Sequence, residues 1–367
     1  MIPRSILVAL CVLGPLTCVA HGGNINGEAT YISFSVPGAL GTYPTGINAS
    51  MEVTGYYNTA PRVTRAFLRE ADGTITTFDV AGATVTQPQG INAAGNITGY
   101  YIDTGVYAAR GFLRYADGRI ITFAAKQTVP FLGLAPVGIN DFDEIAGNCT
   151  SDSQTAFTRS RAGEFTTIAL SNEAGIATAL NASGSVVGFY GGGGNHVFTG
   201  FVAHPDGYWA KIGIPGNPAC ANQTIPDAIN AAGTIAGFFT MSYYPEPGCN
   251  PLSTGGFVMS PGGEVTLFHP PGQIPQFHNL AVGASFIFAP HWISIDQAGD
   301  ITGSYFDAAG FHGFVRNPYG TITSFDPPDS QYTNPTSIND GGAIAGYYSY
   351  NNTGGSQPPV GFIRIPL

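Results

Sequence analysis

The sequence is poor in basic side chains. Its 367 residues include 13 Lys or Arg against 23 Asp or Glu, only 10% of the chain is charged, and the only lysines are Lys126 and Lys211. Proteins that bind nucleic acid or an anionic membrane need a cluster of basic residues. We therefore expect no nucleic-acid partner and no membrane insertion.

Long hydrophobic stretches are also scarce. The run from 6 to 16 follows Arg4 and precedes Cys18-Val19-Ala20, the pattern of a signal peptide cleaved before His21, and it is too short to span a membrane. We predict a signal peptide over residues 1–20 and a secreted, extracellular protein over residues 21–367. The alternatives are lipid attachment at Cys18, where Thr17 is an unusual preceding residue, and retention in a periplasm.

Recognisable catalytic and metal-binding motifs are missing as well. There is no G-x-S-x-G, no phosphate-binding glycine loop and no Cys-x-x-Cys. The acidic turn Asn140–Glu144 has oxygen ligands that suit calcium but not the regular spacing, and we interpret it as a solvated turn. A carboxylate pair for glycoside hydrolysis cannot be assigned, because we place Asp79, Asp103, Asp307 and Asp326 in different repeats. We expect no metal and no cofactor.

Most of the chain is built from variants of one segment, Gly90–Phe123. It contains four short stretches of β-forming residues, 90–92, 96–101, 111–115 and 119–123. Tight turn signals, such as Asp117-Gly118, separate them, and no part has helical spacing. The segment is therefore predicted to form four antiparallel strands.

The start of this segment recurs near positions 46, 90, 138, 179, 228, 294 and 337. Repeats of about 40–50 residues with four strands each are typical of β-propeller blades. We predict an all-β fold, a seven-bladed β-propeller of four-stranded blades in one domain. The Asn or Asp of each Gly-Ile-Asn-like triplet is expected to hold a tight turn, and the Tyr-Tyr pairs are expected to pack between blades.

The two ends of the chain predict how the ring closes. The last repeat has a third strand at 361–364 and no fourth strand, whereas residues 30–37 near the start resemble the fourth strand at 321–327. We predict that the N-terminal strand completes the last blade, which protects the edges of both blades.

Three cysteines remain after signal cleavage. Cys220 lies between the fourth and fifth blades and Cys249 lies in a second-to-third strand loop of the fifth, so both loops open on one face. Export permits disulfides, and we predict a Cys220–Cys249 bridge. Cys149 aligns with Tyr101 on a second strand, and we predict a buried free thiol.

That same face is where we expect binding, because its loops vary in length and sequence. Residues 269–292, HPPGQIPQFHNLAVGASFIFAPHW, form an insertion between the fifth and sixth repeats. Its three histidines, at 269, 278 and 291, lack the spacing and the acidic partners of a metal site. The candidate ligand-binding residues are Tyr243, Tyr244, Phe277, His278, His291 and Trp292.

The repeated pattern G-F-L-x-x-x-D-G-x-I-T-x-F followed by G-I-N-x-x-G-x-I-x-G-Y-Y resembles that of the extracellular HAF-type repeat proteins of bacteria. The resemblance covers the predicted mature chain, although Gly-Phe-Leu or Gly-Phe-Val replaces the usual Ala-Phe-x-Trp. It implies secretion and a propeller-like fold, and it implies no activity. We expect a monomeric binding module for a carbohydrate or a cell-surface protein. The alternatives are a polysaccharide lyase or glycoside hydrolase acting at the same face, and a purely structural surface protein.

Overall fold

A computed structural model describes residues 29–105, 108–124, 133–150, 155–170, 175–191, 198–214, 223–241, 253–274, 293–350 and 358–367. All regular elements in these ranges are β-strands, which confirms the all-β prediction. The described part of the chain contains no helix long and apolar enough to cross a membrane.

The first sheet has eight strands and consists of two antiparallel four-stranded units. One parallel residue pair, Thr64 with Val85, joins the units. The strands are β2 (Thr42–Ile47), β3 (Val53–Ala60), β4 (Val63–Arg69), β5 (Ile75–Phe78), β6 (Ala83–Ile91), β7 (Ile97–Asp103), β8 (Arg110–Arg114) and β9 (Ile120–Phe123).

Three separate four-stranded antiparallel sheets follow in chain order. Their strands are β10 (Gly133–Ile139), β11 (Ile145–Thr150), β12 (Thr155–Arg159), β13 (Phe165–Thr167), β14 (Gly175–Leu180), β15 (Val186–Gly191), β16 (Phe198–Ala203), β17 (Trp209–Ile212), β18 (Gln223–Ile229), β19 (Ile235–Met241), β20 (Ser253–Met259) and β21 (Val265–Phe268).

The last sheet joins the two ends of the described chain. β1 (Ala29–Phe34) pairs antiparallel with β28, and Ile32 lies opposite Ile363. Like the first sheet, it consists of two units joined by one parallel pair, here Phe311 with Tyr332. Its other strands are β22 (Ile293–Ile295), β23 (Ile301–Phe306), β24 (Phe311–Arg316), β25 (Ile322–Phe325), β26 (Tyr332–Ile338), β27 (Ile344–Ser349) and β28 (Val360–Pro366).

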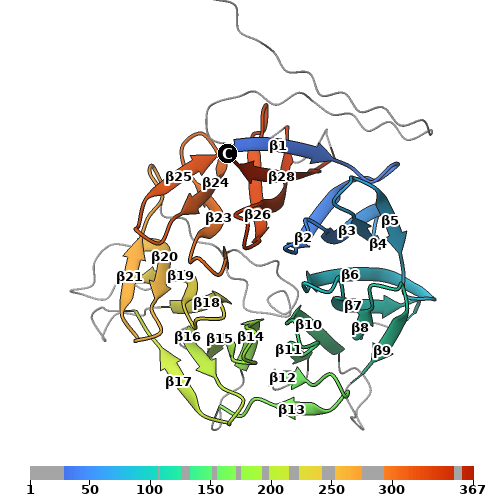
Figure 1. Cartoon of the computed structure of the whole chain (residues 1–367), viewed down its shortest axis with the longest axis horizontal. Coiled ribbons are helices and arrows are strands. Elements are labelled where there is room, and N and C mark those ends of the chain that lie inside the picture. Colours follow the sequence, from blue (N-terminus) through green and yellow to red (C-terminus); the bar gives the residue numbers. More distant parts are fainter. Residues whose placement is uncertain are drawn as a thin grey trace, which may run out of the picture.

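The units are arranged around a common centre, with first strands such as β6 and β10 inside and fourth strands such as β9 and β17 outside (Figure 1). Since successive strands run antiparallel, the first-to-second and third-to-fourth turns emerge on one face, which we call the short-turn face. The second-to-third loops and the connections between units emerge on the opposite face, the long-loop face.

Most first strands contain a β-bulge just before the repeated triplet. In β6, for example, the register shifts between Pro88 and Gly90, so Gln89 is the extra residue. A proline is tolerated there because the ladder is already interrupted. Opposite it, a Cβ on Gly99 would lie 2.1 Å from the Gln87 carbonyl oxygen. The glycine before each aromatic pair is therefore required by close backbone approach.

The triplet asparagines hold their turns, as predicted, and also link neighbouring units. Asn92 Oδ1 accepts hydrogen bonds from the amides of Ala94 and Asn96, while its Nδ2 donates to the Asn140 carbonyl oxygen of the next unit. Equivalent side-chain bonds run from Asn48, Asn140, Asn181, Asn230 and Asn339. The bond from Asn339 reaches Asn48, so this asparagine belt joins the last unit to the first.

A second repeated contact packs the outer strands. A buried arginine at the end of a third strand lies over the phenylalanine at the end of the preceding unit's fourth strand, and its Nη1 commonly donates to the next backbone carbonyl. The Arg–Phe pairs are Arg69–Phe34, Arg114–Phe78, Arg159–Phe123, Arg316–Phe268 and Arg364–Phe325. Each pair closes the outer part of one interface between units.

The cysteine predictions have different outcomes. Cys220 and Cys249 lie outside the described residues, so the proposed bridge remains a prediction. Cys149 is a free thiol on β11, at the position matching Tyr101, but it is half-buried rather than buried. Its place near the loop end of the strand leaves it partly exposed, and burial of the remainder raises the pKa of the thiol.

Candidate functional site

The six residues proposed for ligand binding, Tyr243, Tyr244, Phe277, His278, His291 and Trp292, lie outside the described residues, as does the predicted signal peptide. The long-loop face, on which these six residues are predicted to lie, can still be described from its strands. Both ends of the insertion are anchored there, by β21 and the residues after it on one side and by β22 on the other.

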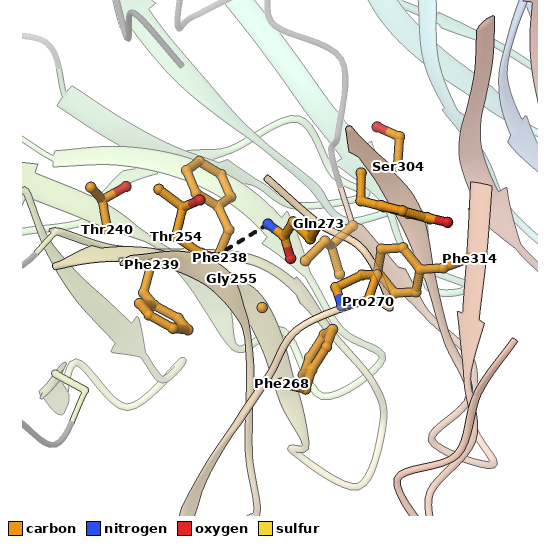
Figure 2. Close-up of a pocket in the computed structure, with 13 residues that line it drawn as sticks. Phe238, Phe239, Thr240, Thr254, Gly255, Phe268, Pro270, Gln273, Ser304 and Phe314 are labelled. Carbon is orange, nitrogen blue, oxygen red and sulfur yellow. Dashed lines mark hydrogen bonds between the residues drawn. The ribbon is translucent and has the colours of Figure 1, made fainter. Parts of the chain in front are cut away.

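A pocket lies on the long-loop face between the unit β18–β21 and the unit β22–β25 (Figure 2). Its volume is about 60 Å³, which is room for a few water molecules. It is lined by Phe238, Phe239, Thr240, Thr254, Gly255, Gly256, Phe268, Pro270, Gln273, Ile293, Ser304, Tyr305 and Phe314. None of these lining residues is a carboxylate or a histidine.

Polar groups in this pocket come from Gln273 and the neighbouring strands. Gln273 Nε2 donates to the Thr254 carbonyl oxygen at 3.3 Å, and Gln273 Oε1 is buried without a hydrogen-bond partner (Figure 2). Phe238 is the only half-buried aromatic ring of the lining. The pocket therefore contains one half-buried apolar ring and an amide oxygen that lacks a donor.

Two units depart from the repeat on their second strands, at Asn148 of β11 and Ser304 of β23, and the pocket lies beside Ser304. The position after the second-strand glycine is aromatic in Tyr56, Tyr100, Phe189, Phe238 and Tyr347, but the matching residue of β23 is Ser304. The smaller side chain leaves space beside Phe238. This departure is visible in the sequence, but its effect depends on which unit packs against β23.

A cluster of tyrosines occupies the same face between the unit β2–β5 and the unit formed by β26–β28 with β1. Tyr43 stacks on Tyr56 with ring centroids 4.8 Å apart and meets Tyr347 edge-on at 5.1 Å. Tyr332 lies parallel to Tyr347 at 6.2 Å. All four rings are half-buried. The prediction that the Tyr-Tyr pairs pack between blades is confirmed here, and the cluster also leaves part of each ring accessible.

The hydroxyl groups of this tyrosine cluster stay protonated at neutral pH. Burial raises the pKa of Tyr56 to about 12 and raises the pKa of Tyr347 well above its ordinary value, and it also raises the pKa of Tyr43 and of Tyr332. Neutral phenols can donate and accept hydrogen bonds but are poor general bases. The cluster is suited to binding rather than to proton abstraction.

The acidic groups of this face that lie near a histidine are already paired. Asp326 Oδ2 lies 2.6 Å from His312 Nδ1, and Asp307 Oδ1 lies 3.1 Å from Nε2. Burial works to lower the pKa of His312, but the hydrogen bonds and charges of the two aspartates outweigh it and raise the pKa. With both ring nitrogens engaged by carboxylates, His312 is a cation with no free lone pair for a metal or a proton.

This cluster corrects the placement of the aspartates. Asp307 and Asp326 belong to one unit, not to different repeats, because they follow β23 and β25 of the same meander. His312 occupies the position held by Arg65 and Arg110 in earlier units, where Arg65 pairs with Asp79 and Arg110 pairs with Asp103. Within the described residues no group of three or more acidic, His or Cys side chains converges on a metal position.

A narrow channel of about 170 Å³ runs through the centre and is lined by the first strands, with Asp227 as its one carboxylate. Asp227 Oδ2 accepts a hydrogen bond from the Ile293 amide at 2.8 Å. The channel lining is otherwise made mostly of small and aliphatic side chains, so it offers little for catalysis.

No family model matches the chain, and no curated protein sequence matches it. Several solved structures are similar in fold. A streptogramin B lyase has 12% identity and a TM-score of 0.56, covering 92% of this chain and 98% of its own. The virginiamycin B lyase of Staphylococcus aureus has 12% identity and a TM-score of 0.55, covering 92% and 99%. A puromycin hydrolase has 13% identity and a TM-score of 0.55, covering 86% and 52%.

These neighbours show that the chain has a β-propeller fold, as the repeat predicted. At such low identity the likeness carries no information on activity. The site must therefore be interpreted from its own residues.

Proposed function

We propose that the protein is an exported, seven-bladed β-propeller in which β1 completes the last blade. Three contacts between the two ends of the chain support this closure: the pairing of β1 with β28, the hydrogen bond from Asn339 to Asn48, and the packing of Arg69 on Phe34. Counting each eight-stranded sheet as two joined blades gives seven blades with the three single sheets. Export is supported by the N-terminal sequence alone.

We further propose that the long-loop face binds a carbohydrate. The observation that carries this proposal is the pocket at Phe238, which contains this half-buried ring and the unpaired Gln273 Oε1. Sugars present apolar C–H faces that pack on aromatic rings and hydroxyl groups that donate to amide oxygens. The tyrosine cluster provides further neutral hydroxyl groups and partly exposed rings on the same face.

A cell-surface protein as ligand, and a lyase or glycoside hydrolase using the same face, are the alternatives. An enzyme of either kind needs a base or a pair of carboxylates at the substrate. Among the described residues of this face, the carboxylates beside His312 are held in ion pairs, and the pocket lining contains no acid. The structure therefore favours binding over catalysis.

The test is retention of the purified chain, residues 21–367, on a panel of immobilised polysaccharides, with parallel measurement of new reducing or unsaturated ends. The variants are Phe238→Ala and Gln273→Ala. Tyr319→Ala is the matched control, since Tyr319 is 95% exposed and lies in a turn on the short-turn face.

We expect retention on at least one polysaccharide, weakened about tenfold or more by Phe238→Ala and unchanged by Tyr319→Ala. New chain ends would replace the binding proposal with the enzyme alternative. Retention that neither pocket variant weakens would place the site elsewhere. If no polysaccharide is retained, the carbohydrate proposal is wrong, and a pull-down with surface proteins tests the remaining alternative.

A further inference from the structure

Two interfaces between units lack the Arg–Phe pair found at the other five. At the end of the fourth strand, the unit β14–β17 has Ile212 where the unit β6–β9 has Phe123. At the end of the third strand, Ala203 in the unit β14–β17 and Met259 in the unit β18–β21 stand in the position of Arg114. The preceding unit, β10–β13, has Ile168 in place of the phenylalanine. The outer parts of these two interfaces must therefore be filled in another way.

The first of these interfaces is filled by an indole. Trp209 lies opposite Ala203 on the neighbouring strand and packs with Ile168 and the buried Tyr190. The Tyr190 and Trp209 rings meet edge-on with centroids 5.9 Å apart. Trp209 thus occupies the volume that the arginine takes elsewhere.

The second interface, between β14–β17 and β18–β21, has no such replacement. A groove of about 600 Å³ opens there on the short-turn face, within the size range of small-molecule sites. Its floor is aliphatic and includes Val202, Ile212, Ile229, Met259 and Val265. Methionine is an adaptable lining residue for an apolar ligand. The groove is therefore open at the place where five other interfaces are closed.

One wall of the groove carries a chain of hydrogen bonds whose direction can be deduced. Asn181 Oδ1 accepts the backbone amide of Ser185, so this atom is the oxygen, and the Ser183 hydroxyl must donate to it at 2.8 Å. The single Ser183 proton is then used. In its contact with Ser183 Oγ at 3.2 Å, the Ser185 hydroxyl is consequently the donor.

The tautomer of His204 depends on the direction of the Ser185 proton. Ser185 Oγ, which lies 3.0 Å from Nδ1, can direct its proton either to that nitrogen or to Ser183; when the proton points to Ser183, Nδ1 carries a proton and donates. In a neutral imidazole Nε2 is then an acceptor.

We propose that this groove binds a small apolar molecule that carries a hydroxyl group. The aliphatic floor takes the apolar body, and His204 Nε2 accepts the hydroxyl proton. This site lies on the opposite face from the proposed carbohydrate site and does not depend on it.

The experiment compares 4-methylphenol with toluene, which has the same ring and no hydroxyl, by calorimetric titration of the full mature chain. The double variant Ile212→Phe with Met259→Arg fills the groove with the pair that the other units use. His204→Leu removes the acceptor. Tyr319→Ala, in an exposed turn of another unit, is the matched control, and thermal unfolding checks that each variant folds.

We expect 4-methylphenol to bind roughly tenfold more tightly than toluene, as one hydrogen bond allows. The filled variant should bind neither compound, His204→Leu should bind both equally, and Tyr319→Ala should match the native chain. Equal affinity of the native chain for both compounds, or no binding of either, would overturn the proposal, as would undiminished binding by a folded filled variant. If the filled variant does not fold, the His204→Leu variant tests the proposal instead. A His204→Leu variant that still prefers 4-methylphenol to toluene would refute the proposed site.

Discussion

Asp296 is the one member of the triplet series that interrupts the asparagine belt. Its Oδ1 accepts a hydrogen bond from the Asp300 amide at 2.8 Å, as the triplet asparagines do in their own turns. Its backbone carbonyl oxygen accepts a hydrogen bond from Asn230 Nδ2. A carboxylate has no N–H, so it cannot donate to the next unit at Asn339 as its counterparts do. The side chain is 2% exposed, and burial raises the pKa of its carboxyl group.

We predict that Asp296→Asn stabilises the protein by about 1 kcal/mol at neutral pH, because it adds the missing donor and removes a buried charge. A raised folded-state pKa means that the native protein gains stability as the pH falls and this carboxyl is protonated, so the advantage of the variant should shrink toward about pH 4. The measurement is the urea midpoint at both pH values.

The matched control for this prediction is Asn230→Asp, which creates a second interruption in the neighbouring unit and should lower the midpoint. An unchanged or lower midpoint for Asp296→Asn would show that the belt contributes nothing at this position.

Among the strands, β1 is the one that joins the two ends of the described chain. It pairs with β28 over six residues, and Phe34 is buried both against its own unit and beneath Arg69 of the next. Without β1, the backbone edge of β28 would be open to pairing with other chains.

We predict that Phe34→Ala lowers the stability by about 3 kcal/mol or more, through the cavity and the loss of the arginine's partner. Deletion of residues 29–37 should lower the melting temperature further and cause concentration-dependent association. Thr30→Ala is the control, since this side chain is exposed and the backbone pairing is kept. Calorimetry and light scattering measure the two effects; a deletion variant that melts like the native chain would contradict the closure.

At the scale of the whole molecule, the buried tyrosines link stability to alkaline pH. Burial raises the pKa of Tyr56 and of Tyr348 to about 12, and it raises the pKa of Tyr347 well above its ordinary value. In the unfolded chain these phenols ionise near pH 10. The unfolded state therefore binds fewer protons above this pH, and the stability that is complete below it is lost as the pH rises toward the folded-state values.

We predict that the free energy of unfolding falls by about 2 kcal/mol between about pH 9 and pH 11, as measured from urea midpoints. Tyr56→Phe should reduce this loss by about 1 kcal/mol, because it removes one of the ionising groups. Tyrosinate absorbance provides the second measurement, in which Tyr56 and Tyr348 should ionise above pH 10. Ionisation of all tyrosines in one step near pH 10, with the fold intact, would contradict the prediction.

The strands could be predicted from the sequence, whereas the candidate site could not. The turns at Asn92 and its counterparts, the four strands of each unit and the β-propeller fold follow from the repeat, because short-range spacing alone determines turns and strands. A proline two residues before five of the seven triplets is a further sequence signal of the bulges. The pocket at Ser304 could not be located, because a small residue leaves space only if its neighbour does not fill it.

The sequence by itself determined the strand order, the recurring turns and the face that carries the variable loops, since each depends on residues close together in the chain. Only the tertiary structure decided that His312 is held by Asp307 and Asp326, and that Trp209 fills one interface while Met259 leaves the next one open. These outcomes depend on side chains from different strands and units meeting in space, and packing volume and hydrogen-bond direction exist only once those strands are assembled.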